Sequence, residues 1–132
     1  MKIAFAKPAL PKGGAIAVPV LAERKLGPTA AALDRRTRGA LTRALEASRF
    51  DGKIEETLAV LAPRGLACSR VVLVGFGKAG ALDALAAQRI GGALVAQLAP
   101  SGETTVALWV DAFAARGRGS YPSARACFFT VL

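Results

Sequence analysis

The sequence predicts an α/β fold: a three-layer α/β/α sandwich with a mixed, mostly parallel sheet. The first observation is the order of segments, β-β-α-β-β-α-β, in which short apolar runs alternate with longer runs of helical period. The second is the run RVVLVGF at residues 70–76, because a continuous branched apolar run is typical of a strand buried on both faces. Helices packed on both faces of the sheet would supply that burial.

The first part of the chain is predicted to form two strands and one long helix. KIAFA at residues 2–6 and AIAVPVL at residues 15–21 are the strands, separated by a turn rich in proline and glycine. Pro19 favours an edge position or a bulge in the second strand, because proline cannot donate a ladder hydrogen bond. A helix is expected from about residue 29 to residue 48, with Thr29 as its N-cap.

The second part adds strands at residues 57–63 and 104–111 and a helix at residues 81–98, besides the buried run already described. Gly91 and Gly92 lie inside this helix, and each costs roughly 1 kcal/mol of helix propensity relative to alanine. Close packing of the helix on the sheet is the expected compensation. The stripe predicted to face the core comprises Leu82, Leu85, Ala86, Ile90, Ala93, Leu94 and Gln97.

The sequence changes character after the last predicted strand. Residues 112–132 have no sustained helical or strand period, and they place isolated glycines among arginines before an apolar end, CFFTVL. We therefore divide the chain into a domain at residues 1–111 and an atypical C-terminal tail at residues 112–132. The composition of the tail resembles out-of-frame translation of GC-rich DNA, which suggests a truncated or frameshifted product.

The composition is that of one globular domain without an evident hydrolytic site. Of 132 residues, 53% are apolar and 20% are charged, and none is histidine, a common metal ligand and general base. Cys68 and Cys127 fit neither a disulfide framework nor a zinc pattern, which favours reduced thiols in the cytoplasm. No apolar run approaches the ~20 residues that cross a bilayer, so no membrane partner is expected. We expect no catalysis by this chain.

The net charge of +9, with a pI near 10.6, favours acidic partners. Nucleic acid is one such partner. The other interpretation is a basic surface complemented by acidic residues elsewhere in a larger chain or assembly. Scattered arginines and few aromatic side chains favour the second interpretation over a dedicated nucleic-acid site.

A G-x-G-x-x-G pattern, formed by Gly75, Gly77 and Gly80, follows the buried run and precedes a predicted helix. In this context the pattern is found in loops that bind dinucleotides, and Lys78 would attract a phosphate. The ribose-binding acid of such sites has one candidate, Asp111, which lies 31 residues beyond Gly80 and therefore farther than the usual ~20. The alternative is a purely structural turn in which glycines let a strand bend sharply into a helix.

Several segments in series resemble the N-terminal domain of the leucyl (cytosol) aminopeptidase family. They are KIAFA, then AIAVPVL followed by GPTAAALD, then SRFDGKIEETLAV, and above all RVVLVGFGKAGALD. The resemblance covers roughly residues 1–111. It implies a macrodomain-like fold, a cytoplasmic location and a non-catalytic role in assembling a hexamer, with DNA binding in some bacterial relatives.

The same resemblance implies two divalent metal ions, zinc or manganese, in a separate catalytic domain of the full-length enzyme. No position here matches the motifs of that domain, so no catalytic or metal-binding residue is assigned to this chain. By this resemblance the glycine loop is a structural turn. The alternative function is a stand-alone module that binds ADP-ribose, a dinucleotide or nucleic acid.

Overall fold

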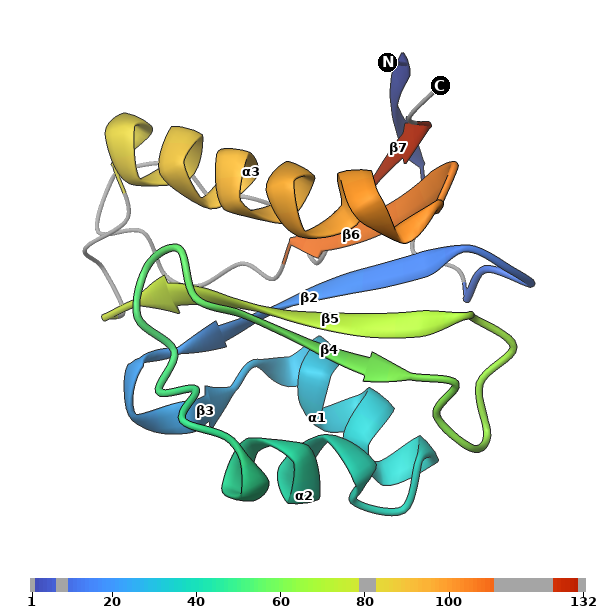
Figure 1. The fold of residues 1–132 in the computed structure, drawn as a ribbon, viewed down its shortest axis with the longest axis vertical. Helices are drawn as coiled ribbons and strands as arrows, with labels where there is room; N and C mark the ends of the chain where they lie inside the picture. The colour runs from blue at the N-terminus through green and yellow to red at the C-terminus, as the bar shows by residue number, and fades with distance from the viewer. Residues whose placement is uncertain (1, 7–9, 79–82, 111–124, 131–132) are drawn as a thin grey trace.

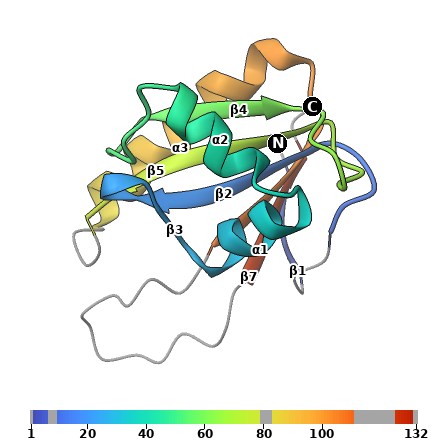
Figure 2. The ribbon, with the colours of Figure 1, turned by 90° about the horizontal axis from the view of Figure 1, so that it is seen from below.

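The computed structural model describes residues 2–6, 10–78, 83–110 and 125–130. A central sheet is covered by two short helices on one face and by one long helix on the other (Figures 1 and 2). The strands are β1 (Lys2–Ala6), β2 (Ala15–Leu21), β3 (Lys25–Leu26), β4 (Thr57–Leu61), β5 (Arg70–Gly77), β6 (Thr105–Val110) and β7 (Arg125–Thr130). The helices are α1 (Pro28–Arg36), α2 (Ala40–Ala47) and α3 (Ala84–Leu98), with short 3-10 turns at Ala22–Arg24 and Ala99–Ser101.

The sheet is mixed, as the sequence predicts, and its strand order is β1-β7-β6-β2-β5-β4, with β3 paired to β2. Parallel pairing is confined to the centre, where β2 lies between β5 and β6. The other pairs in the described residues are antiparallel, so "mostly parallel" was wrong. The pair β4 and β5 shows why: the chain between them, residues 62–69, is too short for the helical crossover that parallel neighbours need.

Two apolar layers hold the helices on the sheet, because side chains alternate between its faces. On the side of α1 and α2, the layer includes Ile16, Val18, Leu41 and Leu73. On the side of α3, it includes Ala17, Val72, Val74, Ile90 and Leu94. The prediction that residues 70–76 form a strand buried on both faces is therefore confirmed.

Pro19 lies in the middle of the sheet and not at an edge. Its side chain is fully buried, and it pairs in register with Val74 of β5. On the other side of β2, pairing with β6 covers only Ala15 to Ala17, so the ladder on that side does not require a donor from Pro19. The irregularity in the strand comes one residue later than predicted, between Val20 and Leu21.

The helix predicted at residues 29–48 is two helices. The first helix ends at Arg36, and Arg38 and Gly39, with φ of 56° and 81°, turn the chain into the second helix, which begins at Ala40. The carboxylate of Asp34 accepts hydrogen bonds from the backbone N–H of Thr42 at 2.9 Å and from its hydroxyl at 2.6 Å. The helical period continues across this break, which is why the apolar pattern did not reveal it. Thr29 is a buried residue of the first turn, and Gly27 is the N-cap residue.

α3 begins at Ala84, later than the predicted residue 81, with Asp83 as its N-cap. Its buried residues are Ala86, Ile90, Leu94 and Leu98. Leu85 is 64% exposed, so its predicted place in the buried stripe was wrong. A Cβ added to Gly91 or Gly92 would have no neighbour within 4 Å, so close helix–sheet packing does not explain these glycines. In the part of the chain that the structure describes, no helix is long and apolar enough for a membrane span.

The sequence predicted neither β3 nor β7. β3 is a two-residue strand beside the end of β2. β7 lies between β1 and β6 and is antiparallel to both. It falls inside the tail at residues 112–132, for which no strand was predicted. Its pairing with β1 joins the two ends of the chain, and such a contact leaves little trace in the local pattern of residues 125–130.

Candidate functional site

The carboxyl ends of β2 and β5 are where a sheet of this kind usually binds ligands. The chain leaves β2 toward the face that carries α1 and α2, and it leaves β5 toward the face that carries α3 (Figure 1). Adjacent parallel strands with connections on opposite faces leave a crevice between their carboxyl ends. The predicted phosphate loop lies here, with Gly75 and Gly77 at the end of β5 and Lys78 exposed just beyond it. Gly80 and Asp111 lie outside the described residues.

This crevice is filled by the chain itself. We call residues 50–56, between α2 and β4, the covering loop. The backbone N–H of Gly75 donates to the carbonyl oxygen of Glu56 at 2.8 Å, and that of Gly77 donates to the carbonyl oxygen of Gly52, also at 2.8 Å. Phosphate-binding loops offer such N–H groups to their ligand. Here both groups are already hydrogen-bonded within the chain.

Glycine is required at Gly75 and Gly52 because two backbones meet. A Cβ on Gly75 would clash with the carbonyl oxygen of Lys53, in the covering loop. A Cβ on Gly52 would clash with the carbonyl oxygen of Leu21, at the end of β2. The covering loop therefore touches the ends of both β2 and β5. Close approach of the chain to itself explains these glycines without a ligand.

Hydrogen bonds from Arg24, which follows β2, and hydrogen bonds within the loop stabilise the covering loop. Arg24 donates from Nε to the carbonyl oxygen of Phe50 at 2.8 Å, and from its backbone N–H to that of Asp51 at 3.3 Å. The backbone N–H of Asp51 donates to the Glu56 carboxylate at 2.8 Å. The Phe50 side chain is buried among the residues under α1 and α2. These contacts hold the loop in one conformation over the crevice.

An ion pair joins the covering loop to α3. The Arg89 guanidinium donates from two nitrogens to the two carboxylate oxygens of Glu55, at 2.8 and 3.1 Å. These hydrogen bonds hold the pKa of Glu55 below its ordinary value and raise the pKa of Arg89. Both side chains are about half exposed, so solvent screens the pair and its contribution to stability is small.

The N-terminus of α3 already carries an anionic cap. The Asp83 carboxylate accepts a hydrogen bond from the backbone N–H of Ala86 at 2.7 Å. A helix N-terminus attracts phosphate through its free N–H groups and its positive dipole. Asp83 satisfies one of those groups and adds a negative charge. This end of α3 is therefore less suited to a phosphate than the sequence pattern suggested.

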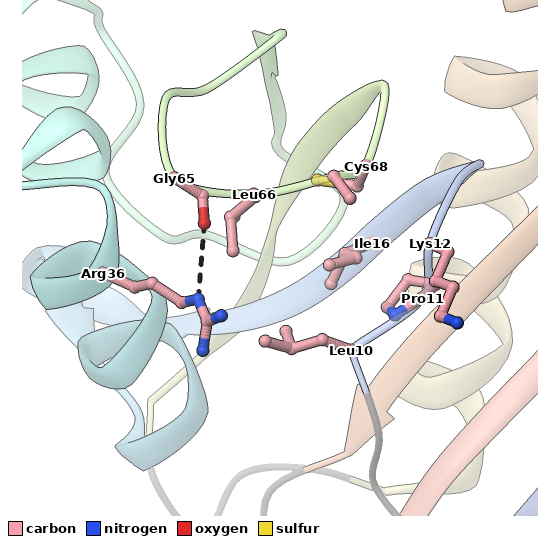
Figure 3. A pocket seen from close by; sticks show the side chains of 9 residues that line it. Leu10, Pro11, Lys12, Ile16, Arg36, Gly65, Leu66 and Cys68 are labelled. Carbon is pink, nitrogen blue, oxygen red and sulfur yellow. Dashed lines mark hydrogen bonds between the residues drawn. The ribbon is translucent and has the colours of Figure 1, made fainter.

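A cavity of about 110 Å³ lies at the opposite end of β2 and β5, beside their amino ends (Figure 3). Its apolar lining includes Leu10, Ile16, Leu66 and Cys68, and burial raises the pKa of the Cys68 thiol, which keeps it neutral. Arg36 and Lys12 also line it, and Arg36 donates from Nε to the carbonyl oxygen of Gly65 at 3.3 Å. Of these residues, only Cys68 was singled out from the sequence, as a reduced thiol.

A second polar cluster lies near the start of β5. The Ser69 hydroxyl is hydrogen-bonded to the carbonyl oxygen of Gly14 at 2.9 Å and to the Glu103 carboxylate. Arg70 forms an ion pair with Glu103 at 3.0 Å. The sequence did not reveal this partner of Ser69, which lies 34 residues away. The cluster connects β5 to the turn before β6.

The described residues do not fit a metal ion. They contain no group of three or more histidine, cysteine, aspartate or glutamate side chains placed to hold one. The two metal ions that the resemblance implies therefore have no set of ligands in the described part of this chain.

The fold and these sites define a class: an α/β domain whose ligand crevice is closed by its own loop. A family model for the N-terminal domain of the cytosol aminopeptidase family matches residues 17–132. The chain belongs to this family, as its N-terminal domain, and the resemblance found in the sequence is confirmed.

Curated relatives agree with this assignment. A "Probable cytosol aminopeptidase" of Azotobacter vinelandii is 36% identical over 121 residues, which are 92% of this chain and 24% of the relative. A protein of the same name from Chelativorans sp. is 39% identical over 104 residues, which are 79% of this chain and 21% of the relative. A third, from Caulobacter vibrioides, is 41% identical over 85 residues. The chain thus spans about a quarter or less of the length of these relatives.

Proposed function

We propose that this chain is a non-catalytic domain of a leucyl aminopeptidase, a metal-dependent exopeptidase, and that it serves assembly or regulation of that enzyme. The observation that carries the proposal is the family match over residues 17–132, which is specific to the N-terminal domain. The lack of a metal-binding group among the described residues supports a role other than catalysis. The two divalent metal ions, zinc or manganese, then belong to the catalytic domain of the full-length protein.

The proposed partners are that catalytic domain and further copies of the same protein, arranged as a hexamer in the cytoplasm. The charge of +9 on 132 residues suits a domain whose neighbours supply acidic surface. The macrodomain-like character of the fold is part of the same proposal. Its support is the α/β architecture with helices on both faces of a mixed sheet.

The boundary at residue 111 stays a prediction. The pairing of β7 with β1 and β6 and the match of the family model up to residue 132 both support placing residues 125–130 in the same domain. The DNA sequence downstream of the codon for Asp111 tests the idea of a frameshift. That idea requires peptidase-like coding sequence in another frame, and it fails if no frame contains it.

A chimera tests the assembly role. Residues 1–132 replace the matching segment of the Azotobacter relative, and this chimera is compared with the relative itself and with a version that lacks the segment. We expect the chain alone to release no product from a leucine anilide with manganese or zinc present. We expect the chimera to match the relative in molecular mass by sedimentation and in anilide hydrolysis, and the shortened version to lose the assembly.

Two outcomes would contradict the proposal. Hydrolysis by the purified chain alone would make it an enzyme in its own right. If the shortened version assembled and hydrolysed the anilide like the relative, the domain would not be required for assembly or activity.

The alternative is a stand-alone module that binds ADP-ribose or a dinucleotide. The engaged N–H groups of Gly75 and Gly77 and the Asp83 cap are evidence against it. Calorimetric titration with ADP-ribose and NAD tests it directly. We expect no heat of binding; saturable heat that disappears in Gly77→Val would favour the module.

A further inference from the structure

The cavity beside the amino ends of β2 and β5 has an apolar interior and a basic mouth. Leu10, Ile16, Leu66 and the neutral Cys68 contribute apolar surface. Arg36, at the end of α1, places its guanidinium between Gly65 and the side chain of Leu10, as Figure 3 shows. The cavity is thus bounded by segments that are far apart in the sequence and that the fold brings together.

The charges at the mouth have one sign. Among the described residues that line the cavity, Arg36 and Lys12 are basic and none is an aspartate or glutamate. Both basic residues are exposed at the surface, so their charges face solvent at the opening. A guanidinium offers paired N–H donors in the geometry that a carboxylate accepts. An anion is therefore favoured here, and a ligand with a free amino group is disfavoured.

The volume limits the apolar part of the ligand. A cavity of about 150 Å³ lined by aliphatic and aromatic side chains holds benzene, so about 110 Å³ suits roughly four or five carbon atoms. A branched aliphatic chain fills such a rounded space better than a longer linear chain. The carboxylate would then stay at the mouth, where water and the Arg36 guanidinium solvate it.

We propose that this cavity binds a small monocarboxylate with a branched aliphatic chain, whose carboxylate pairs with Arg36. The site is distinct from the glycine crevice, which lies at the other end of the same strands. It is also independent of the assembly role, because it requires only the contacts of this chain. With few atoms buried, the expected dissociation constant is on the order of 1 mM.

Titration followed by two-dimensional amide NMR of the 132-residue chain tests the proposal, with 4-methylpentanoate as the probe. We expect saturable shifts at Leu66, Ala67 and Cys68. We expect 4-methylpentan-1-ol, which has the aliphatic chain but no carboxylate, to bind at least about 10-fold more weakly. Acetate has the carboxylate but no aliphatic chain, and we expect it to be weakened by at least about the same factor. Leucine should also bind more weakly than 4-methylpentanoate, because its ammonium group lies beside its carboxylate and is repelled by the Arg36 guanidinium.

Matched variants separate recognition from general effects. Arg36→Gln should weaken binding of 4-methylpentanoate about 10-fold, because a charge-assisted bidentate pair is lost. Arg36→Lys keeps the charge and should fall between that variant and the unaltered chain. Arg35→Gln is the control: it removes a neighbouring exposed charge from the same helix but does not line the cavity.

The proposal is overturned by any of three results. The first is the absence of saturable shifts at residues 66–68 up to ~50 mM probe, well above the expected dissociation constant. The second is equal binding of the acid and the alcohol. The third is equal weakening by Arg36→Gln and Arg35→Gln, which would reduce the effect to net charge.

Discussion

The two ends of the central strands β2 and β5 differ in what occupies them. At the carboxyl ends, where ligands usually bind, carbonyl oxygens of the covering loop accept hydrogen bonds from the N–H groups of Gly75 and Gly77. At the amino ends, a cavity of about 110 Å³ with a basic mouth remains open. A glycine-containing loop lies at each end. The covering loop fills the space at the carboxyl ends, whereas the loop with Gly65 leaves a cavity at the amino ends.

This difference teaches that a glycine pattern does not identify a ligand site by itself. Gly75 and Gly77 fit the pattern of a phosphate loop, but they are explained by the backbone that crosses them. The open cavity is lined by Leu10, Arg36 and Leu66, which belong to no motif. Whether a space is open depends on which distant segment reaches it.

Gly75→Ala should produce the largest effect. The new Cβ meets the carbonyl oxygen of Lys53, so the covering loop must move and its hydrogen bonds must break. We expect the free energy of unfolding to fall by about 3 kcal/mol, measured by urea denaturation. A loss below ~1 kcal/mol would mean that the loop yields easily and that the crevice can open.

Gly65→Ala makes the matching change at the open end. Gly65 has φ of +85°, and its Cβ would come within 2.5 Å of the carbonyl oxygen of Arg36. We expect a loss of about 2 kcal/mol in the same experiment, since a left-handed alanine costs 1–2 kcal/mol and this exposed loop can shift. A loss equal to that of Gly75→Ala would show that both ends are equally rigid.

Asp83→Ala removes the cap of α3 beside the closed crevice. The N–H of Ala86 loses its partner, and the dipole of the helix loses a nearby negative charge. We expect a loss of about 1 kcal/mol, again from urea denaturation. Asp83→Asn, which keeps a capping oxygen, should recover most of this loss; no recovery would place the effect elsewhere.

Gly92→Ala should stabilise the protein. The position lies on the exposed side of α3 with nothing within 4 Å of an added Cβ. We expect a gain of about 0.7 kcal/mol in the free energy of unfolding, because alanine is the better helix former. Gly91→Ala is the control, with the same open surroundings and the same expected sign. A loss in either variant would indicate a neighbour at this surface.

Glu55→Gln should give the smallest effect. The native state lowers the pKa of Glu55 through Arg89, so the ion pair stabilises the fold above the ordinary glutamate pKa of about 4.3. That contribution disappears as the pH falls through the lowered native pKa. We therefore expect the free energy of unfolding of the variant to be slightly lower than that of the unaltered chain at pH 7, and equal to it at pH 3. An equal difference at both values would contradict the ion pair as the cause.

Local patterns predicted much of the fold. The run at residues 70–76 is the buried strand β5, and the predicted strands at residues 2–6 and 15–21 match β1 and β2. Features set by distant contacts were missed. The break at Gly39 interrupts a continuous helical period, and the pairing of β7 with β1 joins the two ends of the chain. At the candidate site, the sequence pattern identified the glycines but not the loop that covers them.

The class of the fold, the family and the lack of histidine side chains could all be recognised in the sequence alone. These properties reside in composition, in periods of a few residues and in the order of motifs, so they can be recognised before the chain folds. Only the tertiary structure decided which end of the sheet is closed. That outcome depends on the covering loop reaching Gly75 from about 20 residues away and on Arg36 meeting Gly65, contacts that form only in three dimensions.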